Sequence, residues 1–148
     1  MKERFKIFTV LVSKINRMIK KIKAEEMAEF ELKSPHVSCL YYIYNMRSLT
    51  AKQLCDICEE DKAAVSRSIE YLEEKGYLEC KSITAKRYKS PLTLTSKGME
   101  IGKLVADKID SMLEVASDGI KESDRIIMYR CLMLISDNLQ KICEKYGD

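Results

Sequence analysis

Apolar residues recur at alternating spacings of three and four near both ends of this chain, which is the 3.6-residue period of an amphipathic helix. From residue 4 to residue 23 the periodic positions are Phe5, Phe8, Val12, Ile15, Ile19 and Ile22. A second periodic run covers residues 96 to about 117, Gly119 interrupts the pattern, and a third run covers about 124–146. The pattern therefore predicts three long helices.

The middle of the chain, residues 34–95, has shorter periodic segments separated by capping and turn residues. Ser34, which a proline follows, is the expected N-cap of one helix, and Thr50 and Asp61 are the expected N-caps of two shorter helices. Gly76 is expected to end the last of these, because glycine tolerates the left-handed conformation. The two short helices are separated by a turn at residues 59–61.

Two short strand candidates follow at residues 77–80 and 91–95, around a loop of basic and small residues. Proline is acceptable at the start of an edge strand, which is the position expected for Pro91. The predicted fold class is mainly α with a small β-hairpin wing: a winged helix-turn-helix plus long N- and C-terminal dimerisation helices. Proteins with this arrangement typically bind duplex DNA.

The terminal helices have more apolar surface than a compact DNA-binding unit of this size can cover, so a second copy of the chain is expected to cover the surplus. We expect residues 1–33 and 96–148 to form a helical dimerisation region and residues 34–95 to form the winged helix-turn-helix DNA-binding region. Together they would make one intertwined domain overall.

The distribution of charge is more informative than the net charge of +3. Residues 1–23 contain eight Lys or Arg and one acid, and residues 81–97 contain five basic residues and no acid. Such local patches attract phosphate. Because basic residues interrupt the N-terminal apolar pattern, no signal segment or membrane span is expected, which predicts a cytoplasmic protein without a membrane partner.

The helix after the turn has an outer face suited to a major groove. A recognition helix contacts base edges from its first two turns, and here those turns contain Lys62, Ala63, Ala64, Ser66 and Arg67. Alanines allow close approach, and Arg67 can reach a guanine or a phosphate. Glutamates further along would repel phosphate, so the helix is expected to enter the groove by its N-terminal end.

Contacts with the DNA backbone are expected from two other places. The donors at the start of the preceding helix are Thr50, Lys52 and Gln53. The basic residues around the expected tip of the hairpin are Lys86, Arg87 and Lys89. A basic arm of this kind suits a minor groove or its flanking phosphates.

The sequence resembles the MarR family of bacterial and archaeal transcriptional regulators. The runs that resemble the family are Asp61-Lys62, Val65-Ser66-Arg67, residues 72–78 and residues 94–98, in this order and spacing. The resemblance covers essentially the whole chain. It implies a homodimer that binds double-stranded DNA at a palindromic operator, most commonly as a repressor that a small aromatic or lipophilic effector, or thiol oxidation, releases from DNA.

Two positions depart from the family pattern. In the wing an Asp-x-Arg is usual, whereas Lys86, Arg87 and Tyr88 stand here without an acid, so the sequence supports phosphate attraction more than minor-groove insertion. Glu60 occupies a usually apolar position, which removes a hydrophobic staple before the recognition helix.

An effector between the dimerisation helices and the winged region would have candidate contacts in His36, Tyr41 and Tyr44. A role in the core is the alternative for the tyrosines, and a surface position is the alternative for the histidine.

Other chemistry has weaker support in the sequence. Cys55 and Cys58 lie within a short predicted helix, where core packing is a better interpretation than a redox motif. By pattern the other cysteines, Cys39, Cys80, Cys131 and Cys143, are also mostly core-like. Of these, Cys80 and Cys143 could be partly exposed. No metal site, cofactor or enzymatic activity is expected, because ligand sets, phosphate loops and nucleophile–base pairs are missing. Two alternatives stay open: a redox-sensing regulator using cysteine oxidation, and a helical protein-interaction module that does not bind DNA.

Overall fold

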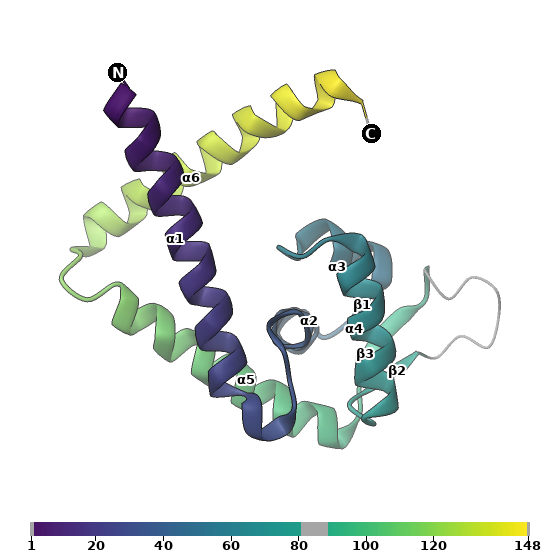
Figure 1. Cartoon of the computed structure of the whole chain (residues 1–148). Coiled ribbons are helices and arrows are strands. Elements are labelled where there is room, and N and C mark those ends of the chain that lie inside the picture. Colours follow the sequence, from purple (N-terminus) through teal and green to yellow (C-terminus); the bar gives the residue numbers. More distant parts are fainter. Residues whose placement is uncertain (1, 81–88, 148) are drawn as a thin grey trace. The chain divides into compact units, whose positions relative to one another are not determined.

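The computed structural model describes residues 2–80 and 89–147 (Figure 1). Within these residues it contains six α-helices and three short β-strands. The chain divides into two compact units, Met1–Asp110 and Ser111–Asp148, and the first contains the whole sheet. The predicted fold class, mainly α with a small β component, is confirmed.

The N-terminal helix α1 (Lys2–Glu26) contains neither glycine nor proline over 25 residues and extends beyond both predicted ends. A single 3-10 turn, η1 (Ala28–Phe30), follows it. Glu31 then adopts the left-handed conformation, with φ of 58°, so the chain leaves the direction of the turn at this residue.

Helix α2 (Ser34–Met46) does not begin with the predicted cap. Its N-cap is Lys33, whose backbone N–H donates to Nδ1 of His36 at 3.1 Å. The prediction that Ser34 caps this helix is therefore wrong. Ser34 lies inside the first turn, and its buried hydroxyl has no hydrogen-bond partner among the described residues. The proline that follows is still in the first turn. Backbone N–H groups there have no intrahelical partner, so the missing N–H of proline costs no helical hydrogen bond.

Helices α3 (Ala51–Ile57) and α4 (Lys62–Glu74) form the helix-turn-helix, and both predicted N-caps are confirmed. Thr50 accepts a hydrogen bond from the first turn of α3. Asp61 Oδ1 accepts one from the backbone N–H of Ala64 at 2.8 Å. A cap of this kind stabilises a helix by about 1 kcal/mol, which matters most for helices as short as α3.

The sheet has three antiparallel strands in the order β1 (Leu49–Thr50), β3 (Pro91–Leu94), β2 (Leu78–Cys80). The two predicted strands are confirmed, but the expectation that Pro91 starts an edge strand is wrong, because β3 is the central strand. Pro91 stands opposite Thr50 as the first residue of β3. Proline is tolerated at that position even in a central strand.

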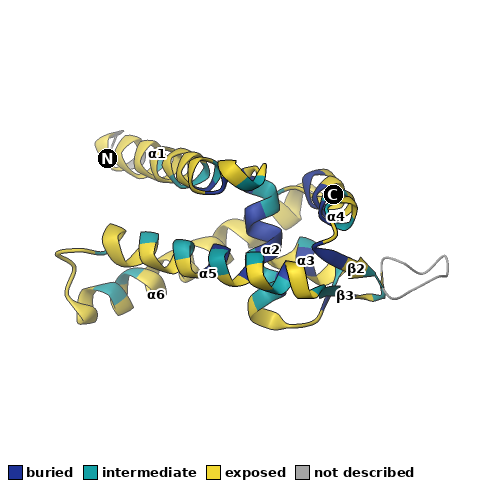
Figure 2. Cartoon of the chain, turned by 90° about the horizontal axis from the view of Figure 1, so that it is seen from below, coloured by how far each residue is buried: buried dark blue, intermediate teal, exposed yellow. Residues whose placement is uncertain are grey.

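The core of the first unit joins α2, α3, α4, the sheet and the first half of α5 (Ser96–Ala116) (Figure 2). Its fully buried members include Leu40, Leu54, Val65, Leu72, Leu92 and Val105. Burying a Leu or Val side chain stabilises the fold by about 1.5–3 kcal/mol. This packing fixes the inner face of α4 and thereby leaves its other face toward solvent.

The second unit contains the end of α5, helix α6 (Glu122–Cys143) and the 3-10 turn η3 (Glu144–Tyr146). No residue of α6 is buried. Cys131 is exposed on this helix, so the prediction of a core-like position for it is wrong in the single chain. No helix in the described part of the chain is long and apolar enough to cross a membrane.

Candidate nucleic-acid interface

Helix α4 presents a polar face to solvent from its first two turns. The exposed residues there are Lys62, Ala63, Ser66 and Arg67. The opposite face packs in the core through Val65, Ile69 and Leu72. Glu70 and Glu74, further along the helix, are also exposed and place negative charge toward its C-terminal end. The face that can approach a polyanion is therefore limited to the N-terminal half of α4.

Ala64 differs from the other residues predicted to contact bases. It is 9% exposed, and its backbone carbonyl accepts a hydrogen bond from the hydroxyl of Ser68 at 2.7 Å. Its methyl group therefore faces the protein interior in the single chain. The surface available to a base consists of the four exposed residues of these turns, without Ala64.

The start of α3 forms a capping box. Thr50 Oγ1 accepts from the backbone N–H of Gln53 at 3.1 Å, and Gln53 Oε1 accepts from the backbone N–H of Thr50 at 2.9 Å. The side-chain amide of Gln53 keeps its own N–H donors, since only its oxygen is used in the box. Lys52 and Gln53 are both exposed. Donors thus surround this helix N-terminus, where the helix dipole favours an anion.

The predicted basic wing lies largely outside the described residues. Lys86 and Arg87 fall in the segment 81–88, and only Lys89 can be placed; it is exposed just before β3. The base of the hairpin is regular, with Leu78 opposite Leu94 and Cys80 opposite Leu92.

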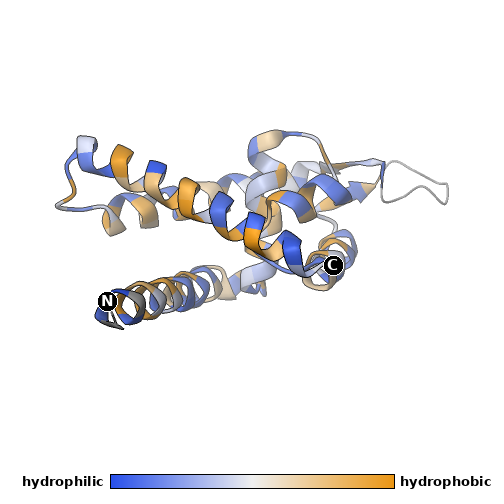
Figure 3. Ribbon diagram, turned by 90° about the horizontal axis from the view of Figure 1, so that it is seen from above, coloured by the Kyte–Doolittle hydropathy of each residue, from blue (hydrophilic) through white to orange (hydrophobic). Residues whose placement is uncertain are grey.

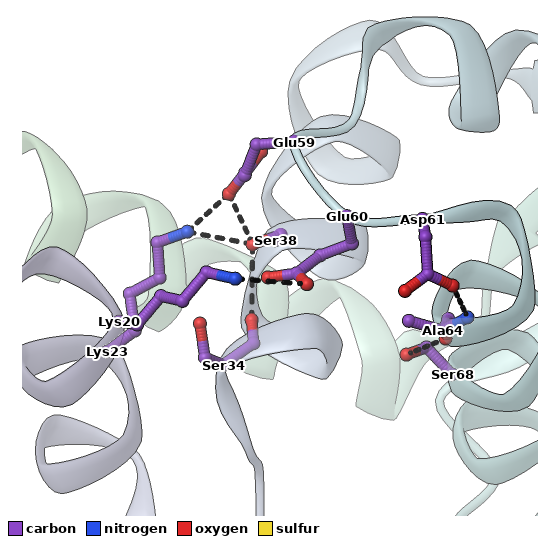
Figure 4. Close-up of polar contacts among 9 residues, drawn as sticks. All are labelled: Lys20, Lys23, Ser34, Ser38, Glu59, Glu60, Asp61, Ala64 and Ser68. Atoms are coloured by element: carbon purple, nitrogen blue, oxygen red, sulfur yellow. Dashed lines mark hydrogen bonds and ion pairs between the residues drawn. The ribbon is translucent and has the colours of Figure 1, made fainter. Parts of the chain in front are cut away.

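The acidic turn between α3 and α4 is bound by basic residues of α1 (Figure 4). The ammonium group of Lys23 forms an ion pair with Glu59 Oε1 and also donates to Ser38 Oγ at 2.8 Å. Ser38 Oγ donates to the same Glu59 oxygen at 2.6 Å. The hydroxyl of Tyr42 donates to the other oxygen, Oε2, at 3.1 Å. Both carboxylate oxygens of Glu59 are therefore bound by side chains of α1 and α2.

Glu60, the next residue of the turn, forms an ion pair with α1 instead of the apolar contact of a hydrophobic staple. Its Oε2 lies 3.5 Å from Nζ of Lys20, and its side chain is only 8% exposed. The second oxygen, Oε1, is buried without a hydrogen-bond partner among the described residues. These two pairs bring positive charge of α1 to acids that would otherwise lie unpaired near the start of α4.

The environment of Glu59 strongly favours its ionised form. Burial alone would raise the pKa of this carboxyl, but the hydrogen bonds from Lys23 and Ser38 outweigh burial and lower the pKa to about 2. The same carboxylate acts on its neighbour: burial first, and then the negative charge of Glu59, raise the pKa of the Tyr42 hydroxyl. Tyr42 therefore remains a neutral donor to Glu59 at physiological pH.

The C-terminal half of α4 is connected to the segment between α1 and α2. The hydroxyl of Tyr71 donates to the backbone carbonyl of Glu31 at 2.7 Å, and Lys75 forms an ion pair with the Glu31 side chain. The ring of Tyr71 stacks on His36 at 4.1 Å between centroids, with 7° between the planes. Both ends of α4 are thus fixed to residues that lie between positions 20 and 36.

Comparisons with known proteins agree with this geometry. Residues 30–87 match the sequence profile of the MarR family. A MarR family regulator from Listeria monocytogenes, solved in complex with a 26mer DNA, has a TM-score of 0.79 to this chain at 24% identity, with 93% of each chain covered. The MepR–DNA complex of S. aureus has a TM-score of 0.77 at 18% identity, covering 89% of this chain and 96% of that one. The chain therefore has a winged-helix fold similar to that of these MarR family structures.

A third similar structure is that of BpsR from Bordetella bronchiseptica, described with regulation of its DNA binding by 6-hydroxynicotinic acid. Its TM-score is 0.72 at 18% identity, and 87% of this chain and 92% of that chain are covered. No curated protein matches this chain in sequence.

Within this winged-helix fold, the three candidate effector residues contact two different helices, His36 one and both tyrosines the other. His36 stacks against α4, and its pKa is lowered by burial and by the nearby Lys33 charge, so it is neutral near pH 7. The Tyr41 hydroxyl instead donates to Asp110 on α5 at 3.3 Å, and the Tyr44 ring packs against Gly102 of α5. Because Nδ1 of His36 accepts from a backbone N–H, Nε2 is the nitrogen left to donate to a ligand.

The Cys55-x-x-Cys58 spacing indicates a pair within α3, but in the structure Cys58 interacts with Cys39 of α2. Cys58, at the C-cap of α3, and burial raise the pKa of the Cys39 thiol on α2, whereas Cys39 lowers the pKa of Cys58. Cys55 and Cys58 are both half-buried and pack against the core. This position agrees with the preferred interpretation of the pair as core residues.

Sequence reasoning missed the role of Lys20 and Lys23. Both belong to the basic N-terminal patch, from which the sequence predicts only an attraction for phosphate. Lys23 is instead 7% exposed and bound within the protein. The one available signal was charge complementarity between this basic helix and the acidic turn at residues 59–61.

Proposed function

We propose that this chain is a DNA-binding transcriptional regulator that reads a major groove with the N-terminal half of α4. The observation that supports this most directly is the exposed set Lys62, Ala63, Ser66 and Arg67, on a capped helix whose other face is fixed in the core. Donors at the start of α3 and Lys89 at the wing would contact phosphates on either side. The MarR match and the two similar structures solved with DNA support the same assignment.

The regulator is proposed to act as a homodimer on a palindromic operator. Of the large apolar side chains that are exposed in the described residues, eight lie on α1 and nine lie on α6. Apolar residues recur along both ribbons in Figure 3. Monomeric soluble proteins rarely expose so much apolar surface, and two copies related by a twofold axis would cover it symmetrically. Two recognition helices about 34 Å apart would then enter successive major grooves.

Repression, with release by a small molecule, is the mode of action that we propose. In a dimer, affinity for DNA depends on the separation of the two reading helices. A ligand that binds more tightly to a conformation with another separation shifts the population toward that conformation. The candidate contacts are His36, Tyr41 and Tyr44, and an aromatic or lipophilic anion fits the donors at Nε2 of His36 and at the hydroxyl of Tyr44, with the Tyr41 ring as an apolar contact. The DNA binding of the similar protein BpsR is regulated by such a molecule, 6-hydroxynicotinic acid.

The test is binding of the purified protein to the DNA flanking its own gene, measured by fluorescence anisotropy over a range of salt concentrations and located by footprinting. Specific binding to a palindromic segment is expected, weakening by about 0.9 log unit per log unit of salt for each phosphate neutralised. Failure to bind any segment, or affinity independent of salt, would favour the alternative of a protein-interaction module.

A further inference from the structure

Helix α1 contacts the helix-turn-helix at the turn that directly precedes the reading helix. Lys23 pairs with Glu59 and Lys20 pairs with Glu60, so both contacts come from the C-terminal end of α1. The rest of α1 exposes the apolar stripe that the proposed dimer would cover. A single helix therefore connects the proposed dimer interface to the base of α4.

The Lys23 contact tightly constrains the position of the turn, because the Lys23 side chain is only 7% exposed. A buried ammonium group without a partner is strongly unfavourable, so the turn must lie where its carboxylate reaches Lys23. Ser38 and Tyr42 hold the same carboxylate from α2, at 2.6 Å and 3.1 Å. The position of Glu59 is thus fixed by three side chains from two helices.

Little chain separates this fixed point from the reading surface. Helix α4 begins at Lys62, three residues after Glu59, and three residues span at most about 11 Å. The intervening Asp61 is itself bound to the first turn of α4 as its cap. Any displacement of Glu59 relative to α1 is therefore passed to the residues that would meet the bases.

We propose that Lys23 is a positioning residue for DNA binding: its ion pair with Glu59 sets where the N-terminal end of α4 lies relative to α1. This inference rests on the proposed dimeric DNA binding. In a dimer formed through α1, the Lys23–Glu59 pair then determines which spacing of two half-sites the protein prefers. Lys23 itself makes no contact with DNA in this proposal.

The experiment compares wild-type protein with Lys23→Met on a set of duplexes. One duplex contains a single half-site from the wild-type footprint, and the others contain two half-sites whose separation changes by single base pairs around the natural one. For Lys23→Met, affinity for the single half-site is expected to stay within about twofold, while the preference for the natural spacing over its neighbours falls about tenfold, the size of a typical coupling between contacting residues. Lys21→Met, an exposed lysine two positions away, is the matched control and should behave as wild type.

A purely structural role would lower the affinities for single and paired half-sites equally, together with the melting temperature, and that result overturns the proposal. So does a Lys23→Met protein with the wild-type spacing preference. If Lys23→Met does not fold, Glu59→Gln provides the same comparison, because it weakens the pair while keeping a hydrogen-bond acceptor for Lys23. Lys23→Arg, which retains the charge, should recover part of the preference. Absence of wild-type binding to every duplex overturns the proposed function itself, and it is seen before any variant is compared.

Discussion

Gly98 lies against Tyr77 so closely that a β-carbon on this glycine would stand 1.8 Å from the Tyr77 carbonyl oxygen. The same carbonyl accepts a hydrogen bond from the backbone N–H of Thr95 at 3.1 Å. The Thr95 hydroxyl in turn accepts from the N–H of Gly98 at 3.0 Å and donates to the carbonyl of Gly76 at 2.6 Å. The start of α5 is thus joined to the end of the α4 segment and the beginning of the wing.

Replacing Gly98 with alanine should destabilise the fold by about 1–3 kcal/mol or more, because the clash is with backbone that cannot rotate away. Gly102→Ala is the comparison. Its β-carbon would meet side-chain atoms, with Tyr44 Cδ2 at 3.0 Å, and a side chain can move. Urea unfolding of the two variants should therefore rank Gly98→Ala as clearly the less stable. Equal losses would mean that the close approach to Tyr77 does not exclude a side chain at position 98.

Glu59 should make the stability of the protein sensitive to acid. Its pKa of about 2 in the fold lies below the ordinary value of 4.5, so its ion pair contributes fully above about pH 4.5 and is lost as the pH falls toward 2. The Glu59→Gln variant lacks this ionisation. Its deficit in free energy of unfolding relative to wild type should be largest near neutral pH and should shrink over that acidic range.

The control for this measurement is Glu122→Gln, which removes a surface partner of Arg125 on α6. Exposed pairs contribute little, so this variant should follow the wild-type pH profile. A Glu59→Gln deficit that stays constant from neutral pH to about pH 2.5 would contradict the assignment of the charge to the ion pair.

The elements that sequence reasoning predicted well are those specified by local patterns. Periodic apolar residues gave the long helices, and the caps at Thr50 and Asp61 were evident because a capping side chain acts within three residues of itself. The N-cap of α2 is one residue earlier than predicted. Its signal is not the capping residue's own side chain, because the backbone N–H of Lys33 donates to the side chain of His36. Strand β1 was missed because two residues are too short to show alternation.

The candidate site divides in the same way. The exposed face of α4 is predictable from its sequence except at Ala64, which faces the core. Neighbouring positions of a helix point in different directions, so a difference of one residue separates a side chain that faces solvent from one that faces the core. The Lys23–Glu59 pair joins residues 36 positions apart, so no local pattern indicates it. Only the packing of α1 on α2 and the turn brings these charges together. The effector contacts and the wing contacts stay predictions.

Arg67 is expected to contribute base recognition as well as charge. Arg67→Ala should reduce operator binding by about 1–3 kcal/mol, with a smaller loss on random DNA, if the guanidinium contacts a guanine. Arg67→Lys is the matched variant, because it keeps the positive charge but not the two parallel donors. It should retain the salt dependence while losing most of the discrimination between operator and random DNA. Equal losses on both DNAs would assign Arg67 to phosphate contact alone.

The last prediction concerns the exposed apolar stripe of α6, which contains Leu132, Ile135, Leu139 and Ile142 at spacings of three and four. This spacing places the four side chains along one side of the helix, the pattern of a surface that packs against another helix. Leu139 is 51% exposed in the single chain. Leu139→Glu would place a charge within the proposed dimer interface, where burial without a partner is unfavourable.

Sedimentation velocity should therefore show the wild type as a dimer and Leu139→Glu shifted toward monomer, with operator affinity reduced in parallel because each monomer reaches only one half-site. Gln140→Glu adds the same charge at the adjacent position, on another side of the helix, and should remain dimeric. If Leu139→Glu is still a dimer while Gln140→Glu is not, the interface uses a different face of α6. A wild type that is monomeric at all concentrations would remove the basis for a palindromic operator.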